Sequence, residues 1–320
     1  MTGSPRYRVV VYGQGYASYD TEGALLAPLG VDGIEPVAPG DVASLETADA
    51  LLVRETPVTA NIVERLRRCQ VIVRYGVGTD NVDLDAARAR RIYVANVPDY
   101  GADEVSDHAL ALLLSVARRV VTRDRQVRCG NWGGKHRAVH PLAGRTLGLV
   151  GYGRIARAFH RKVACLGPGK TLVYDPHLER TPAGVSLVEL ETLCKEAQII
   201  SLHAPLTPET RNLIGRDTLG HMDAKTILVN TARGGLIDQD ALVEALRDNR
   251  IFGAGLDVFE DEPLAVDHPL CELDNVVLTD HIAWYSEASV KELQSKAAQE
   301  VARVLSGQPP ISWVNRWEER

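Results

Sequence analysis

One segment of the chain constrains its fold more than any other, the apolar strand Thr146–Val150 that runs directly into Gly151-x-Gly153-x-x-Ala156 and a helix. In such a motif the first glycine permits a tight turn, the second lets the backbone approach a pyrophosphate, and the small third residue lets the helix pack on the strand. The helix N-terminal amides then face an anion. This arrangement predicts a dinucleotide-binding α/β unit; a glycine-rich structural turn in another α/β protein is the alternative.

The next apolar stretch, Thr171–Tyr174, ends at Asp175. An acidic residue about 20 positions after the glycines binds the adenosine ribose hydroxyls in such folds. A carboxylate accepts hydrogen bonds from a ribose diol and repels a 2′-phosphate, so Asp175 favours NAD and disfavours NADP. Arg154, in the first helical turn, either pairs with the pyrophosphate or faces solvent, and His177 is expected to be a surface neighbour of the adenine.

Apolar, β-branched runs recur along the whole chain with helix-compatible stretches between them, a pattern typical of parallel α/β sheets. The aromatic content is only 5%, which suits a core of Val, Leu, Ile and Ala. The first series of predicted strands comprises Arg8–Tyr12, Ala50–Val53, Val71–Val73 and Ile92–Ala95, with a helix over Ala60–Arg68. The second comprises Thr146–Val150, Thr171–Tyr174, Gln198–Leu202, Thr226–Asn230, Gly253–Asp257 and Asn275–Thr279. Six strands in the second series predict a complete doubly wound nucleotide fold.

A predicted helix separates the two series of strands, and further helices are predicted within and after the second series. The stretch Ala102–Arg125 has acidic residues at its start, arginines at its end and a middle that is apolar nearly all round, which predicts one long helix buried between larger units. A domain boundary is expected near its start, and Gly130–Gly144 interrupts the pattern after it. Ser186 with Glu189 predicts a capping box, Asp238 predicts an N-cap, and a last helix is expected over Ser286–Leu305.

Composition excludes several classes of protein. With 45% hydrophobic and 24% charged residues the chain is globular, and a net charge of −6 gives no positive surface for nucleic acid or anionic lipid. No run of about 18 apolar residues predicts a membrane span, and the first residues lack a secretory pattern, so a cytoplasmic location without membrane contact is expected. The 5 cysteines stand singly, which predicts neither disulfides nor a metal site.

Three polar loops follow strands of the second series, at the sheet edge where doubly wound folds bind ligands. They contribute Arg233, the pair Asp257 and Glu262, and His281. Any one of these could be an ordinary loop residue, but together they place a guanidinium, carboxylates and an imidazole beside the cofactor loop. Hydride transfer to a ketone leaves an alkoxide, which histidine can protonate near neutral pH. Glu262 would fix the imidazole tautomer, and Arg233 would bind a substrate carboxylate.

These motifs, over nearly the entire chain, resemble the D-isomer-specific 2-hydroxyacid dehydrogenase family. The resemblance implies that Arg233, Glu262 and His281 form the catalytic site. It also implies that the stretch Arg74–Asn81, with Tyr75, Gly76, Val77 and Gly78, is a substrate loop whose amides at Val77 and Gly78 hold the substrate carboxylate. The alternative for this stretch is a plain turn at the end of a strand.

The resemblance further implies a set of cofactor contacts on intact family motifs. These are Gly151, Tyr152, Gly153, Arg154, Ile155, Asp175, His203, Pro205, Thr231, Ala232, Arg233, Asp257 and His281. The branch that looks closest contains the C-terminal-binding corepressors and phosphoglycerate dehydrogenase-like proteins. Trp284 would there contact the substrate side chain, with packing against the hinge helix as the equal alternative. Two departures stand out, Asp280 where proline is usual and the stretch Leu166–Lys170 before the second nucleotide strand.

The family architecture implies two doubly wound parallel-sheet domains with a cleft between them. Residues 1–101 with 286–320 would form a flavodoxin-like substrate domain, residues 102–285 an inserted Rossmann NAD-binding domain, and the nucleotide domain would form a homodimer. The expected function is NAD-dependent interconversion of a 2-oxo acid and a D-2-hydroxy acid. The alternatives are an NAD(H)-sensing corepressor-like binding protein and a dehydrogenase of a small anion such as formate or phosphite. Phosphoglycerate also stays open as a substrate, although no regulatory domain is expected after Arg320.

Overall fold

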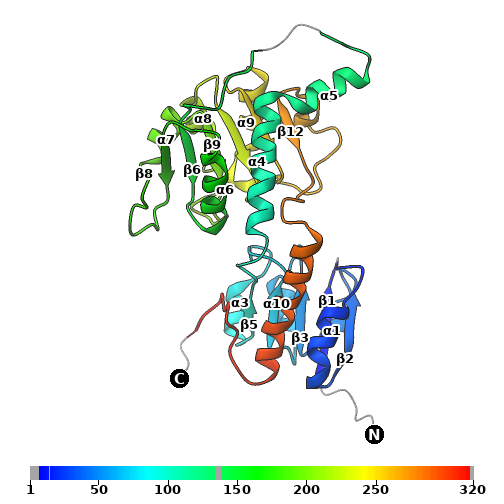
Figure 1. The fold of residues 1–320 in the computed structure, drawn as a ribbon. Coiled ribbons are helices and arrows are strands. Elements are labelled where there is room, and N and C mark those ends of the chain that lie inside the picture. Colours follow the sequence, from blue (N-terminus) through cyan, green and yellow to red (C-terminus); the bar gives the residue numbers. More distant parts are fainter. Residues whose placement is uncertain (1–6, 14, 134–137, 318–320) are drawn as a thin grey trace. The chain divides into compact units, whose positions relative to one another are not determined.

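The computed structural model describes residues 7–13, 15–133 and 138–317. Residues 1–6, on which the expectation about a leader partly depends, and part of the interruption at 130–144 lie outside these ranges. The described residues belong to two compact units, Met1–Tyr100 with Ser286–Arg320 and Gly101–Tyr285 (Figure 1).

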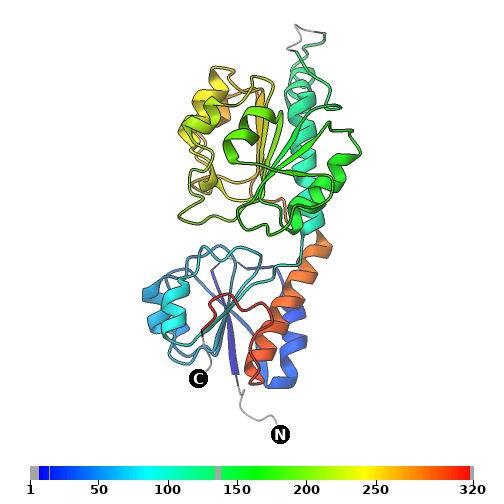
Figure 2. The same cartoon turned by 90° about the vertical axis from the view of Figure 1, so that its left-hand side faces the viewer.

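The first unit is a parallel sheet in the order β2-β1-β3-β4-β5, which is the flavodoxin-like strand order. Its strands are β1 Tyr7–Tyr12, β2 Val31–Val37, β3 Ala50–Val53, β4 Val71–Arg74 and β5 Tyr93–Ala95. Its helices are α1 Asp20–Leu26, α2 Ala60–Arg65, α3 Leu84–Ala89 and α10 Glu287–Leu305. Helices α1 and α10 lie side by side on one face of the sheet, and the sheet separates them from α2 and α3 (Figure 2).

Strand β2 was not predicted from the sequence, because Gly33 and Pro36 break its apolar alternation. The structure accommodates both residues because β2 is an edge strand, paired only with β1 and with a register irregularity between Tyr7 and Val9. A proline without an N–H is tolerated at such an edge.

The second unit contains a parallel sheet in the order β12-β11-β10-β9-β6-β7-β8, which is the Rossmann order with one additional strand. Its strands are β6 Leu147–Val150, β7 Thr171–Tyr174, β8 Ser186–Leu187, β9 Ile199–Leu202, β10 Ile227–Asn230, β11 Gly253–Leu256 and β12 Val276–Leu278. Its helices are α4 Ala102–Arg118, α5 Val120–Arg128, α6 Arg154–Ala164, α7 Leu190–Glu196, α8 Arg216–Gly220 and α9 Gln239–Arg247. Two parallel sheets with helices confirm the predicted α/β class.

The capping box predicted at Ser186 and Glu189 is wrong. Ser186 lies in the short strand β8, which pairs with β7, and Glu189 is itself the N-cap of α7 without a side-chain cap. Ser186 pairs with Leu172 at the edge of the sheet, so it does not cap α7. The predicted N-cap at Asp238 is confirmed, since its side chain accepts a hydrogen bond from the Ala241 amide at 3.0 Å.

The single long helix predicted over 102–125 is two helices. Arg119 between them has φ 54°, and its guanidinium lies 4.5 Å from the centroid of the Phe252 ring, an interaction that sequence periodicity does not reveal. Burial all round is also wrong, because α4 packs Leu112 and Leu113 inward against the sheet while Ala111 is exposed. Among the described residues, no helix is both long and apolar enough to span a bilayer.

Candidate active site

The glycine loop after β6 has the backbone that its sequence predicts. Gly151 has φ 83°, and a Cβ there would lie 2.9 Å from the Ala204 nitrogen, so only glycine fits. Gly153 is the N-cap of α6, has no side chain to cap the helix, and has open space where a Cβ would stand. The first amides of α6 therefore suit a close-lying anion.

Asp175 lies at the end of β7 and is fixed against this loop. One carboxylate oxygen accepts a hydrogen bond from the Tyr152 amide at 2.8 Å, and the other accepts one from the His177 amide at 3.0 Å. The structure thus places the predicted ribose-binding acid beside the glycine loop. His177 reaches Asp175 through its backbone and lies on the surface.

Tyr152 packs beneath the loop. Its hydroxyl is hydrogen-bonded to Nδ1 of His160 at 2.8 Å, and Nε2 of His160 lies 3.1 Å from the Thr171 hydroxyl. Burial lowers the pKa of His160. The backbone of Tyr152 is also hydrogen-bonded within the unit, because its amide donates to Asp175 and its carbonyl accepts a hydrogen bond from Nε of Arg157 at 3.1 Å. Arg154 is exposed and Ile155 half-buried in the first turn of α6.

Two predicted cofactor residues carry buried polar atoms with no hydrogen-bond partner among the described residues, the hydroxyl of Thr231 and Nε2 of His203. A polar ligand would satisfy such atoms, and they follow strands β10 and β9 at the same sheet edge as the glycine loop. Pro205, after His203, is exposed. Together with the uncapped N-terminus of α6 and the position of Asp175, the orphaned Thr231 hydroxyl fits a bound dinucleotide.

Burial lowers the pKa of His203 to about 3, because the imidazolium cannot be solvated where the ring packs against Phe159. The unfolded chain takes up a proton at His203 near the ordinary pKa of 6.5, whereas the folded chain does not, so His203 costs stability as pH falls below 6.5. Relative to His203→Gln, the wild type should lose about 2 kcal/mol of unfolding free energy between pH 7 and 5, measured by urea unfolding. Parallel stability profiles of the two proteins would contradict this prediction.

The loop after β10 is held by Asn230, a residue that sequence analysis did not select. Its buried side chain accepts a hydrogen bond from the Ala232 amide at 3.0 Å and donates one to the Arg233 carbonyl at 2.9 Å. Arg233 also donates through Nη1 to the Ala232 carbonyl at 2.7 Å. An asparagine at the end of a buried strand was the available signal, because a buried amide side chain requires partners.

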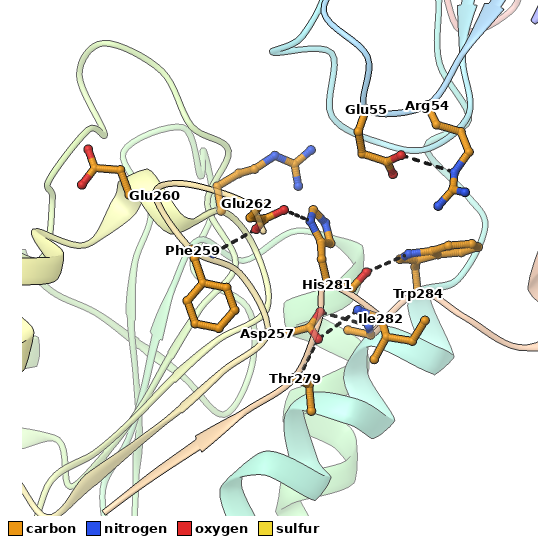
Figure 3. A network of polar contacts seen from close by, with 12 residues as sticks. Arg54, Glu55, Asp257, Phe259, Glu260, Glu262, Thr279, His281, Ile282 and Trp284 are labelled. Atoms are coloured by element: carbon orange, nitrogen blue, oxygen red, sulfur yellow. Dashed lines mark hydrogen bonds and ion pairs between the residues drawn. The ribbon is translucent and has the colours of Figure 1, made fainter. Parts of the chain in front are cut away.

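His281 and Glu262 form a close pair, with Nδ1 of the imidazole 2.6 Å from Oε2 of the carboxylate (Figure 3). Oε1 of Glu262 accepts a hydrogen bond from the Phe259 amide at 2.9 Å. Burial alone would raise the pKa of Glu262, but the hydrogen bond and charge of His281, the Phe259 amide and the charge of Arg233 together lower it. The pair is partly open, since the His281 side chain is 27% exposed and that of Glu262 33%.

The main chain of His281 is held at both ends of the residue. Its amide donates to the Asp257 carbonyl at 2.8 Å, and its carbonyl accepts a hydrogen bond from the Trp284 indole at 3.0 Å. Trp284, which the resemblance placed at the substrate pocket, therefore braces the backbone of the candidate catalytic histidine (Figure 3). Asp280, the residue that departs from the family pattern, is exposed.

Asp257 is fully buried, and its carboxylate is occupied by protein groups. One oxygen accepts hydrogen bonds from the Thr279 hydroxyl at 2.6 Å and the Ile282 amide at 3.0 Å, and the other from the Ala283 amide at 3.0 Å. These bonds hold the turn that carries His281, and the cofactor contact that the resemblance implied for Asp257 stays a prediction.

The predicted substrate loop belongs to the first unit. The Tyr75 side chain is 2% exposed and donates from its hydroxyl to Oε1 of buried Glu22 at 2.6 Å, so it supports the loop from the core. Gly76 has φ 136°, and a Cβ there would meet the Arg74 guanidinium at 1.5 Å. Val77 is exposed and Gly78 half-buried; among the described residues, neither amide donates a hydrogen bond. Two consecutive amides are therefore available to an anion.

Residues 110–283 match the family profile described as D-isomer specific 2-hydroxyacid dehydrogenase, NAD binding domain. A glyoxylate reductase of Korarchaeum cryptofilum is 40% identical over 284 residues, which cover 85% of this chain and 84% of that protein. A D-3-phosphoglycerate dehydrogenase of Methanocaldococcus jannaschii is 40% identical over 276 residues, 85% of this chain and 52% of that protein. The chain thus belongs to the D-isomer specific 2-hydroxyacid dehydrogenase family.

The chain spans about half the length of the phosphoglycerate dehydrogenases that it matches. Among solved structures, D-lactate dehydrogenase from Aquifex aeolicus, complexed with NAD and lactic acid, has a TM-score of 0.85 and 28% identity, with coverage of 94% of this chain and 96% of that one. An acyclic imino acid reductase in complex with NADPH and D-Arg has a TM-score of 0.86 and 26% identity, with coverage of 95% and 99%. Similar folds therefore occur with either dinucleotide.

Proposed function

We propose that this protein is an NAD(H)-dependent dehydrogenase that interconverts a 2-oxo acid and a D-2-hydroxy acid. The proposal rests on the His281–Glu262 pair, in which Nδ1 of the imidazole lies 2.6 Å from Oε2 of the carboxylate. Asp257 and Trp284 hold the turn that carries His281. A pre-positioned imidazole with a carboxylate on one ring nitrogen is a general acid–base pair. Membership of the family supports the same reaction class.

The dinucleotide would be held by the glycine loop at Gly151–Gly153, by the first amides of α6, by Asp175 and by the hydroxyl of Thr231. When bound, a nicotinamide supplies the hydride in the direction of reduction and accepts it in the direction of oxidation. Asp175 favours NAD, because its charge opposes a 2′-phosphate.

His281 protonates the carbonyl oxygen of the 2-oxo acid during reduction and removes the hydroxyl proton during oxidation. Its Nδ1 faces Glu262, so Nε2 is the nitrogen that meets substrate. The pKa of Glu262 is lowered, hence its carboxylate stays charged and stabilises the imidazolium. Arg233 binds the substrate and polarises its carbonyl, and the amides of Val77 and Gly78 bind the carboxylate.

The decisive experiment is a pair of screens. The first tests 2-oxo acids with NADH and measures the loss of NADH absorbance, and the second tests the D- and L-2-hydroxy acids with NAD and measures the gain of NADH absorbance. Glyoxylate, hydroxypyruvate, pyruvate and longer 2-oxo acids form the panel, with formate and phosphite as further donors. Turnover of a 2-oxo acid and of only the D-hydroxy acid supports the proposal. Tight NADH binding without turnover would overturn it in favour of a binding protein, and oxidation of formate or phosphite alone would assign a different reaction.

We also propose that the protein forms a homodimer through the second unit. Helix α5 buries none of its residues, and its Val120, Val121 and Val127 are each at least 40% exposed. Isolated helices shorter than about 12 residues are marginal in water, so a helix of this kind needs a partner surface. A second copy of the chain would supply it.

The double substitution Val121→Asp and Val127→Asp should convert the dimer to a monomer, because two carboxylates would be buried without partners. Light scattering coupled to size-exclusion chromatography measures the mass. The matched control is Val266→Asp, which changes a 95% exposed valine outside α5 and should leave the mass unchanged. A wild-type monomer, or a dimer that survives the double substitution, argues against this interface.

A further inference from the structure

The turn that carries the candidate catalytic imidazole has an unfavourable backbone. His281 has φ 54°, in the left-handed region that only a few per cent of residues other than glycine occupy, although histidine is among the residues enriched there. Such a conformation persists only where its surroundings determine it. Here Asp257 holds the conformation of the turn (Figure 3). Its carbonyl accepts a hydrogen bond from the His281 amide, and its carboxylate accepts hydrogen bonds from the next two amides, those of Ile282 and Ala283.

A hydrogen-bond chain leads from this turn to helix α4. The Thr279 hydroxyl donates its single proton to Oδ1 of Asp257 at 2.6 Å. Nε2 of His108 lies 2.9 Å from the same hydroxyl oxygen and 3.5 Å from Oδ1 of Asp257. Since the Thr279 proton is already committed, the hydroxyl oxygen must accept, and Nε2 of His108 must carry the donated hydrogen.

His108 is well placed to hold this chain. It lies on α4, a helix fixed by buried Leu112 and Leu113, and its own side chain is only 23% exposed. A donor on a rigid element restrains its acceptor more tightly than a donor on a loop does. Neither His108 nor Thr279 has a place in the chemistry proposed above.

We propose that His108 is a positioning residue for His281, acting through Thr279 and Asp257. The donor on His108 fixes the rotamer of the Thr279 hydroxyl, the hydroxyl fixes the carboxylate of Asp257, and the carboxylate holds the turn on which His281 meets Glu262. The effect on catalysis rests on the proposed function. The geometry of the turn can be tested without measuring turnover.

The kinetic test compares two substitutions at His108. His108→Leu removes the donor, and we expect kcat for a 2-oxo acid to fall about ten- to hundredfold while KM and NADH affinity change little, since a small misplacement of catalytic groups lowers rate more than binding. His108→Gln retains an N–H donor near the Nε2 position and should restore most of kcat. His221→Leu, at an exposed histidine outside the site, is the matched control and should behave as wild type.

Thr279→Val interrupts the same chain from its other end while keeping the side-chain shape. Its kcat should fall as in His108→Leu, and the double variant should lose little more than either single variant, because both break one pathway. If His108→Leu fails to fold, as judged by circular dichroism, Thr279→Val and His108→Gln still test the proposal. Fully additive losses in the double variant would overturn it.

An activity-independent readout comes from protein labelled with [13Cε1]histidine. The chain has 9 histidines, and His281 is assigned from the signal lost in His281→Asn. We expect one sharp His281 resonance in the wild type and in His108→Gln, and a broadened or doubled one in His108→Leu and Thr279→Val. An unchanged His281 signal in the last two variants overturns the positioning role even if the enzyme turns over. A changed signal in a protein that turns over no 2-oxo acid sustains the positioning role and removes only the proposed function.

Discussion

Substituting asparagine for His281 should lower kcat/KM for a 2-oxo acid by about 10²–10⁴-fold, the usual contribution of a general acid–base group. Asparagine tolerates a positive φ, so the turn at φ 54° should survive, and the loss will report the imidazole itself. Because the glycine loop, Asp175 and Thr231 are unchanged, most of the proposed dinucleotide contacts remain, and the Kd for NADH should stay within about threefold. Initial rates and quenching of protein fluorescence by NADH measure the two quantities.

The matched control for this experiment is His221→Asn, which makes the same change at an exposed histidine of the same unit. It should retain wild-type rates. If His281→Asn also retains them, the imidazole is not the acid–base group, and another residue must deliver the proton.

The second large effect is expected at Asp175. Replacing it with asparagine should reduce the preference for NADH over NADPH in kcat/KM by about two orders of magnitude, because hydrogen bonds to a charged group contribute about 1.5–3 kcal/mol and the repulsion of a 2′-phosphate disappears. The asparagine oxygen can still accept the Tyr152 amide, which now bonds the carboxylate at 2.8 Å, so the loop should keep its shape. Steady-state kinetics with both dinucleotides give the ratio.

Asp240→Asn, an exposed carboxylate on α9, removes the same charge away from the cofactor loop and should leave the ratio unaltered. A preference for NADH that persists unchanged in Asp175→Asn would show that other residues exclude the 2′-phosphate.

Local patterns predicted the strands of both sheets well where they are apolar and continuous. Thr171–Tyr174 and Ala50–Val53 have the predicted bounds, and the glycine loop has the backbone that its residues require. The failures lie where a distant contact competes with a local signal. Ser186 pairs with the sheet in β8 instead of forming the predicted capping box. Strand β2 forms at a sheet edge although it contains a proline, and the predicted long helix is divided at Arg119, which has a positive φ.

The candidate site divides in the same way. The sequence identified Arg233, Glu262 and His281 by residue type and by position after a strand. It did not identify Asn230, Thr279 or His108, which act by holding other residues. It did not reveal that the Tyr75 side chain supports a loop from the core or that the Asp257 side chain holds a turn; the ligand contacts predicted for these two residues stay predictions.

The amino-acid sequence by itself thus determines the two α/β series, the dinucleotide motif and the set of reactive groups, because these depend on residue type and on short-range periodicity. Tertiary structure alone decided which atoms meet. The 2.6 Å pair of His281 and Glu262, the buried carboxylate of Asp257 and the donor on His108 bring together residues from separate strands and a helix. The free energy of such contacts depends on the distance between the groups and on their burial, and short-range sequence patterns do not specify either quantity for residues far apart in the chain.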